Sequence, residues 1–168
     1  AAFRRAGITR VYSLEQMFDC VEGLGREIHV EGPRLAVVTN GGGPGVMATD
    51  SLMDQKAVLA QLGPATIDEL NAFLPANWSK RNPDDVIGDA TAERLGRATK
   101  TVLGDPGVDA VIVIVSPQRM TDAKACAQAV IEVTKSQAKP VLACWLGGVS
   151  MTEAIEMLNR AEIPTFPT

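Results

Sequence analysis

The chain has 168 residues, of which 46% are hydrophobic and 21% are charged, and its formal net charge is −4. This length suits a single globular domain, and the mild acidity with scattered Lys and Arg residues argues against a nucleic-acid surface. Because no apolar run approaches the roughly 20 residues that span a bilayer, the sequence predicts no membrane segment and a cytoplasmic protein.

The N-terminal residues predict a helical lead-in that belongs to a longer chain. Ala1–Ala6 is typical of the end of a helix that Gly7 terminates, and no capping residue precedes it. Ser13-Leu14-Glu15-Gln16 is a capping box, after which apolar residues recur on one face of a helix. We therefore expect a lead-in helix and linker over residues 1–32, packed on the outside of a domain over 33–168, and a fragment of a larger multidomain protein.

Histidine and cysteine contribute no candidate chemistry of their own. The single histidine, His29, lies in the predicted linker without converging ligands or a nucleophile, so we expect a solvated side chain. The three cysteines are odd in number, unclustered and set in apolar surroundings, which indicates buried free thiols: Cys20, Cys126 and Cys144. The sequence therefore predicts no Ser/His or Cys/His nucleophile and no metal site.

A strand, a glycine-rich turn and a helix follow one another at residues 34–54. The apolar run at 35–38 leads through Thr39 into four glycines and Pro44, and Val46–Met53 is typical of a helix. Pro44 suits the first helical position, where its missing N–H is not needed. Backbone N–H groups and the positive end of the helix dipole favour an anion there. We therefore predict a phosphate-binding site formed by seven consecutive residues: Asn40, Gly41, Gly42, Gly43, Pro44, Gly45 and Val46.

The remaining segments alternate between strands and helices. Apolar runs predict strands over 57–62, 109–115, 139–144 and 163–166, and capping signals predict helices that open at Thr66, Thr91, Asp122 and Ser150. The run at 109–115 is apolar after its first residue, which is typical of a central strand covered on both faces. The pattern predicts an α/β fold, namely a three-layer, flavodoxin-like, doubly wound parallel sheet of five strands in the order 2-1-3-4-5.

Ligands of such sheets bind beyond the carboxyl ends of the strands, where the strand order reverses. Three loops are expected to meet there, over residues 40–46, 116–121 and 145–149. Secondary site candidates are Gln118, Arg119, Thr121 and Asp89. Asp89 lies in a polar stretch, residues 77–89, that predicts an ordered loop, and it is alternatively a cap for the helix that follows.

Nucleotide-binding motifs are absent or incomplete. No lysine follows the glycines, as a Walker loop requires, and the predicted second strand ends without the acidic residue that binds a dinucleotide ribose. Trp145 could stack on a flavin, but an aromatic content of 4% leaves few partners for such a ring. Phosphate therefore remains the favoured ligand.

Three motifs resemble those of the nucleoside-diphosphate-forming acid–CoA ligases. They are TNGGGPGV at 39–46, NPDDVIGDA at 82–90 and DPGVDA at 105–110, and they occur in the family's order. The chain is similar to the flavodoxin-like ligase-CoA domain that corresponds to the C-terminal domain of the succinyl-CoA synthetase β subunit. The resemblance covers nearly the whole chain from about Gly32 and includes the helical lead-in.

The resemblance implies an enzyme that joins a carboxylic acid to CoA with ATP or GTP and Mg, through an acyl phosphate and a phosphohistidine on a mobile loop. Two helix N-termini cradle that phosphohistidine in the family, and the helix at Gly43-Pro44-Gly45 would be one of them. The histidine loop, the CoA-binding domain and the ATP-grasp domain are missing from these 168 residues. We expect those domains as partners, phosphate or sulfate as a ligand, no tightly bound cofactor, and no activity of this domain alone.

One departure and two alternatives accompany the resemblance. Asp84 stands where the family usually has an apolar residue, so it either weakens phosphate binding or points to solvent. Similar ligase-like regions also occur in GNAT-type protein lysine acetyltransferases, where they would serve regulation and assembly, and residues 2–7 and 74–79 resemble that branch. A pure interaction module, with the glycine turn serving only packing, is the third possibility.

Overall fold

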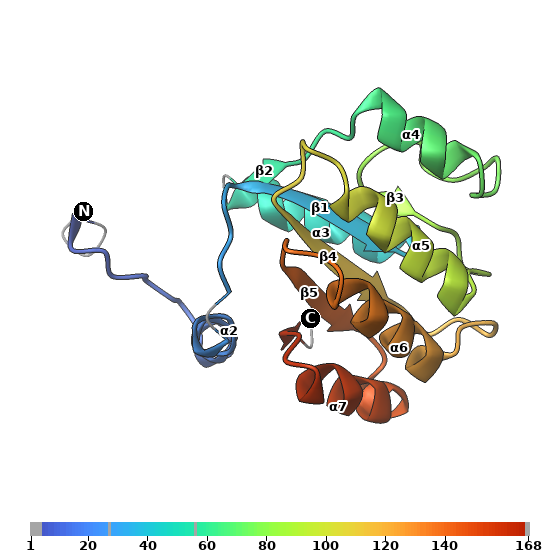
Figure 1. The fold of residues 1–168 in the computed structure, drawn as a ribbon. Helices are drawn as coiled ribbons and strands as arrows, with labels where there is room; N and C mark the ends of the chain where they lie inside the picture. The colour runs from blue at the N-terminus through green and yellow to red at the C-terminus, as the bar shows by residue number, and fades with distance from the viewer. Residues whose placement is uncertain (1–4, 27, 56, 167–168) are drawn as a thin grey trace.

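The computed structural model describes residues 5–26, 28–55 and 57–166, and a parallel β-sheet forms their core (Figure 1). The strands are β1 (Arg34–Thr39), β2 (Val58–Leu59), β3 (Asp84–Asp85), β4 (Ala110–Val115), β5 (Val141–Trp145) and β6 (Thr165–Phe166). Their order is β2-β1-β4-β5-β6, with β3 paired to β1 outside this path. The five strands expected from the sequence therefore lie in the predicted order, and the doubly wound α/β fold is confirmed.

Helices cover both faces of the sheet, as the three-layer prediction requires. They are α2 (Leu14–Gly25), α3 (Gly42–Asp54), α4 (Pro64–Asn71), α5 (Ala92–Leu103), α6 (Ala123–Thr134) and α7 (Thr152–Arg160), with a 3₁₀ turn, η1 (Gly148–Met151), before α7. The larger apolar core lies between the sheet and α4 to α7, and a smaller one lies under α3 (Figure 1). Val113 and Ile114 of β4 are buried in different cores, as a strand covered on both faces should be.

The strand β3 lies within residues 77–89, for which the sequence predicts an ordered loop and no strand. Asp84 and Asp85 pair in parallel with Val38 and Thr39, so β2 and β3 share one edge of β1. The gap between them is closed by Asn82, whose side chain accepts a hydrogen bond from Val37 N and donates to Leu35 O and Ala60 O at 2.8–3.1 Å. The sheet therefore has a sixth short strand, and one side-chain amide completes its edge.

Several helix starts differ from the predicted ones. α4 begins at Pro64 after Gly63, so the expected capping box at Thr66 is not used, since Pro preorganises the first turn. The Ser150 hydroxyl donates to Gly147 O in a 3₁₀ turn and does not cap α7. For α5 the cap is Thr91, which accepts from Arg94 N, and the suggested cap Asp89 forms an ion pair with Arg94 instead.

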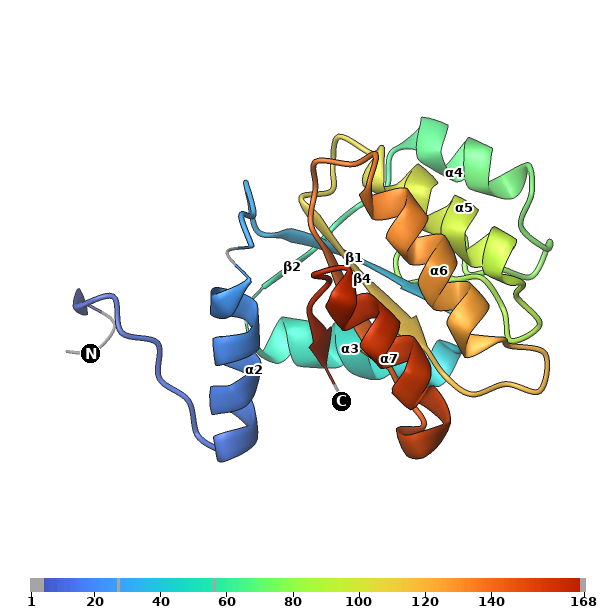
Figure 2. The same cartoon turned by 60° about the horizontal axis from the view of Figure 1, so that its bottom comes forward.

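The lead-in helix α2 lies beside the domain (Figure 2). Its predicted cap is confirmed, because Ser13 accepts a hydrogen bond from Gln16 N at 3.1 Å. Gly7 has φ 69°, as expected after a helix, but most of residues 1–6 lies outside the described residues. None of the α2 residues is buried, so the apolar face does not pack on the domain as predicted. No helix in the described part of the chain is long and apolar enough to cross a membrane.

Candidate phosphate-binding site

The first turn of α3 presents two backbone amides at the carboxyl end of β1. The helix begins at Gly42, so Pro44 is its third residue. The prediction that Pro44 takes the first helical position is wrong. Gly45 N already donates to Gly41 O at 3.3 Å, and Pro44 has no N–H. Among the described residues, no partner accepts from the N–H groups of Gly42 and Gly43. These two amides are therefore available to an anion.

Close packing beneath the turn explains the glycines on either side of these amides. A Cβ atom at Gly41 would lie 2.8 Å from Ser116 Oγ, and one at Gly45 would lie 3.0 Å from Thr39 Cγ2. Gly43 differs, because an added Cβ would meet nothing within 4 Å. The glycine-rich sequence thus lets α3 start directly on the sheet, while Gly43 itself faces open space.

Asn40 joins the first and second loops of the site. Its amide nitrogen donates to Ser116 O and Thr121 Oγ1 at 2.9 and 3.0 Å, and its oxygen accepts from Ser116 N at 2.8 Å and from Ser116 Oγ at 3.1 Å. The residue is 2% exposed. Its side chain therefore holds the carboxyl ends of β1 and β4 together, and its predicted contact with phosphate remains untested.

The secondary candidates lie around the same edge. Gln118 Nε2 donates to Ser116 Oγ at 3.3 Å and packs near Gly88, whereas Thr121 is engaged by Asn40. Arg119 is exposed, and so is Asp89 beside Arg94. The third expected loop also meets the second, since a Cβ at Gly147 would lie 3.3 Å from Pro117. The three loops therefore converge as predicted.

Two adjacent carboxyl groups lie in β3, and only that of Asp85 reaches the start of α3. Asp85 Oδ2 would lie 3.0 Å from a Cβ at Gly42, and its Oδ1 accepts from Ile87 N at 2.9 Å. Asp84 is 0% exposed, and neither of its carboxyl oxygens has a hydrogen-bond partner. Burial, and secondarily the charge of Asp85, raises the pKa of Asp84 to about 7. The prediction that Asp84 might point to solvent is therefore wrong.

The third family-like motif, DPGVDA, forms hydrogen bonds between loops at the amino ends of the strands, opposite the candidate site. Asp105 accepts from Gly63 N and Gly107 N at 2.7 Å each. Burial raises its pKa, but hydrogen bonds from Thr66, Gly63 and Gly107 outweigh burial and lower it. Asp109 binds the Arg34 guanidinium at 2.6 and 2.9 Å, and this contact lowers the pKa of Asp109 to about 2. The motif thus stabilises the fold and lies away from the α3 amides.

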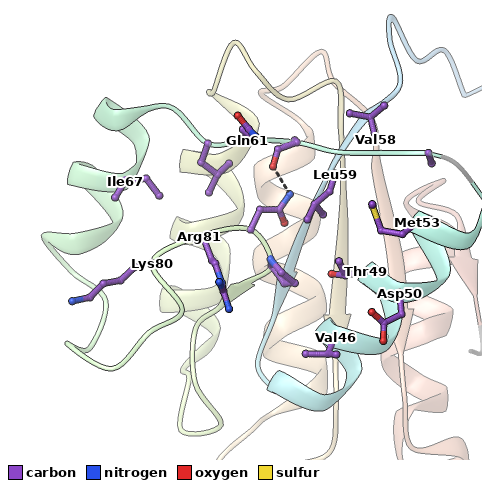
Figure 3. Close-up of a pocket in the computed structure, with 15 residues that line it drawn as sticks. Val46, Thr49, Asp50, Met53, Val58, Leu59, Gln61, Ile67, Lys80 and Arg81 are labelled. Carbon is purple, nitrogen blue, oxygen red and sulfur yellow. Dashed lines mark hydrogen bonds between the residues drawn. The ribbon is translucent and has the colours of Figure 1, made fainter.

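A cavity lies beside α3 and not over its first residues (Figure 3). It measures about 900 Å³ and runs between α3, the β2 segment and the loop at 80–83. Val46 and Thr49 line one side, while Lys80 and Arg81 come from the loop (Figure 3). Val46 thus faces this cavity, and its amide lies inside the helix. The candidate phosphate site is an exposed helix start and not a closed pocket.

Trp145 and the cysteines take part in packing. Trp145 is 1% exposed and donates from Nε1 to Ala123 O at 3.2 Å, so it offers no ring to a flavin. Cys126 and Cys144 are buried free thiols, as expected, and burial raises the pKa of each to about 11. Cys20 is only half-buried, in contrast to the prediction. His29 is exposed, as expected for a linker residue.

The strand order and the glycine turn after β1 place the chain in a class of doubly wound α/β domains. In this class, a helix start at the carboxyl ends of the strands is a typical anion site. A family model described as the ligase-CoA domain matches residues 35–168. The chain therefore belongs to the ligase-CoA domain family.

Known relatives share both sequence and fold over the whole chain. Acetate–CoA ligase (ADP-forming) I of Archaeoglobus fulgidus is 36% identical over 99% of the chain, which spans 23% of that protein. Subunit alpha of acetate–CoA ligase (ADP-forming) II of Pyrococcus furiosus is 34% identical over 99% of the chain, which spans 37% of that subunit. The solved acetyl-coenzyme A synthetase 1 of Ca. Korarchaeum cryptofilum, in complex with phosphate and ADP, matches 99% of the chain with TM-score 0.92 and 34% identity. The chain spans 36% of that structure.

Proposed function

We propose that this chain is the domain of an ADP-forming acid–CoA ligase whose α3 helix binds the phosphoryl group of a phosphohistidine. The observation that carries the proposal is the pair of unpartnered amides at Gly42 and Gly43, which lie at the helix start that the three converging loops build. Membership of the ligase-CoA family and the ADP-forming relatives support the reaction class.

The chemistry of this domain is electrostatic stabilisation. A phosphoryl dianion at the start of α3 would accept hydrogen bonds from Gly42 and Gly43 and would lie at the positive end of the helix dipole. Asn40 would keep this turn in place by its bonds to Ser116 and Thr121. No side-chain base takes part in this proposal. The domain would therefore stabilise transferred phosphate and would leave bond formation to groups elsewhere in the enzyme.

The other components of the reaction belong to further domains in the same proposal. ATP or ADP with Mg would bind to an ATP-grasp domain, CoA to its own domain, and the reactive histidine to a mobile loop. This domain alone would then be inactive, and the enzyme would be cytoplasmic. The acetyltransferase alternative gains no support, because the relatives reported above are CoA ligases.

Phosphate transfer can be tested with Gly43→Val in the complete enzyme. An added Cβ atom at Gly43 meets nothing within 4 Å, so the valine side chain should obstruct the anion without disturbing the fold. With radiolabelled ATP and Mg, we expect an acid-labile, base-stable protein label in the wild type and at least about a tenfold slower rate of labelling in the variant, equal to the loss of about 1.4 kcal/mol. Gly23→Val in α2, where an added Cβ also meets nothing within 4 Å, is the matched control. Equal labelling rates in all three proteins would refute the role of α3.

A further inference from the structure

A buried carboxyl group lies in the short strand that flanks the candidate site. Asp84 of β3 is fully buried, and its two carboxyl oxygens have no hydrogen-bond partner among the described residues. A buried ionised carboxylate without partners is strongly unfavourable, so such a group is kept neutral or the structure around it opens. The strand of Asp84 has only two residues, and the buried side chains of Asn82 before it and Val86 after it hold it in the sheet.

The two carboxylates of β3 face opposite sides of the sheet. Asp85 pairs with Thr39, whose side chain lies under Gly45 of α3, and Asp85 itself reaches the start of that helix at Gly42. Asp84 pairs with Val38, which belongs to the larger core on the other side. One strand therefore connects a carboxyl group in the core to the residue that touches the phosphate-binding turn.

Asn82 anchors the chain just before this strand, and backbone hydrogen bonds hold the residues that follow Asp84. Val86 N donates to Thr39 O at 2.8 Å, and Asp85 N donates to Ser79 Oγ at 3.0 Å. The turn after β3 then carries Gly88, where an added Cβ would lie 3.4 Å from Gln118. Loss of the pairing between β3 and β1 would thus move both Asp85 and Gly88, which lies next to Gln118 at the edge of the site.

We propose that Asp84 is a positioning residue for the phosphate site: in its neutral form it lets β3 pair with β1 and holds residues 85–88 against α3, and its ionisation releases them. The expected effect on phosphate binding rests on the proposed function, because the released segment borders the amides of Gly42 and Gly43. The proton leaves Asp84 for solvent when β3 opens, and no other group needs to change.

The charged groups around Asp84 agree with this role. Asp85, beside it on β3, raises its pKa further. The strand β1 carries one charged residue, Arg34, which Asp109 holds at the far end of the strand. On α3 the charged residues are Asp50 and Asp54, and both are acidic. From α5, Arg94 donates to Val86 O at 3.3 Å but is paired with Asp89. None of these contacts supplies a hydrogen bond to the Asp84 carboxyl group.

Hydrogen exchange at Val86 N–H measures the opening of β3 directly. With a pKa of about 7 in the closed form and an ordinary value of 3.8 when exposed, the opening equilibrium should rise about thirtyfold between pH 5.5 and pH 8 and stay constant above that. The protection factor of Val86, corrected for intrinsic exchange, should fall by the same factor in the 168-residue chain. Asp84→Asn, which remains neutral in both states, should show protection that does not change between pH 5.5 and pH 8 and is at least as high at pH 8 as that of the wild type at pH 5.5.

Sulfate is the probe for the consequence at the site, because its charge is constant over this pH range. We expect weaker sulfate binding at pH 8 than at pH 5.5 in the wild type, measured from the amide shifts of Gly42 and Gly43, and no such change in Asp84→Asn or Asp84→Val. Asp68→Asn, an exposed carboxylate on α4, is the control and should behave as the wild type.

Two results would overturn the inference. One is Val86 protection that does not depend on pH, or that depends on it equally in Asp84→Asn. The other is opening at Val86 that leaves bound sulfate unaffected. Failure of sulfate to bind at any pH would instead refute the phosphate site, and the release of β3 would then be judged by Val86 alone.

Discussion

The side-chain amide of Asn82 takes the place of a strand residue beside Val37. It accepts from Val37 N at 2.8 Å and donates to Leu35 O and Ala60 O, all within a buried edge of the sheet. Asn82 thereby bridges the gap between β2 and β3 and positions the two acidic residues that follow it. The candidate site therefore depends on a residue that does not itself face the ligand.

Asn82→Ala should destabilise the fold strongly. It leaves one backbone N–H and two carbonyl groups without their partner, and each lost buried hydrogen bond costs about 1 kcal/mol or more. We expect the free energy of unfolding to fall by about 3 kcal/mol, measured by urea denaturation. Asn71→Ala, which removes the acceptor of the Trp78 indole N–H nearer the surface, should cost clearly less. An equal loss in both variants would contradict the role of Asn82.

Asn40 and Thr121 should be energetically coupled. Asn40 donates to Thr121 Oγ1 at 3.0 Å, and Thr121→Val keeps the shape of the side chain while it removes this acceptor. In a double-mutant cycle with Asn40→Ala, we expect a coupling energy of about 1 kcal/mol in the unfolding free energy. Additive effects would show that the two loops are held together by Ser116 alone.

Asp84 should make stability depend on pH above the acid range. Its folded-state pKa is raised to about 7 from 3.8, so the folded chain keeps a proton that the unfolded chain loses. Stability therefore falls as pH rises from about 4 to 7 and is constant above 7, with a total loss of about 4 kcal/mol. Asp84→Val should lack this loss and be more stable at pH 8, as urea midpoints at several pH values would show. A wild-type stability that stays level across this window would contradict the burial of an unpaired carboxyl group.

Asp109 should contribute to stability in the opposite sense. Its hydrogen bonds to the Arg34 guanidinium lower its folded-state pKa to about 2, so its contribution is present above about pH 4 and disappears as pH falls through 2. The difference in urea midpoint between the wild type and Asp109→Asn should therefore shrink between pH 5 and pH 2. A difference that is the same at both pH values would show that the ion pair is not the cause.

The sequence alone determined the order of the elements, the strand order and the presence of a glycine turn and a helix directly after β1. These features follow from local patterns: an apolar run over β4, glycines after β1, and connections long enough for parallel crossovers. The convergence of the three loops also follows, because the carboxyl ends of parallel strands meet at one edge. The family-like motifs supported the same conclusions.

The tertiary structure decided what local patterns do not encode. The strand β3 consists of Asp84 and Asp85, whose residue type is depleted in strands, and it forms only because β1 offers a free edge there. The hydrogen bonds of Asn40 and Asn82 join residues more than 20 positions apart, so no spacing predicts them. The choice among competing caps, such as Pro64 over Thr66, depended on where the chain must leave the sheet. Burial of Asp84 has the same origin, because a side chain's access to water is set by what packs on it and not by its own sequence.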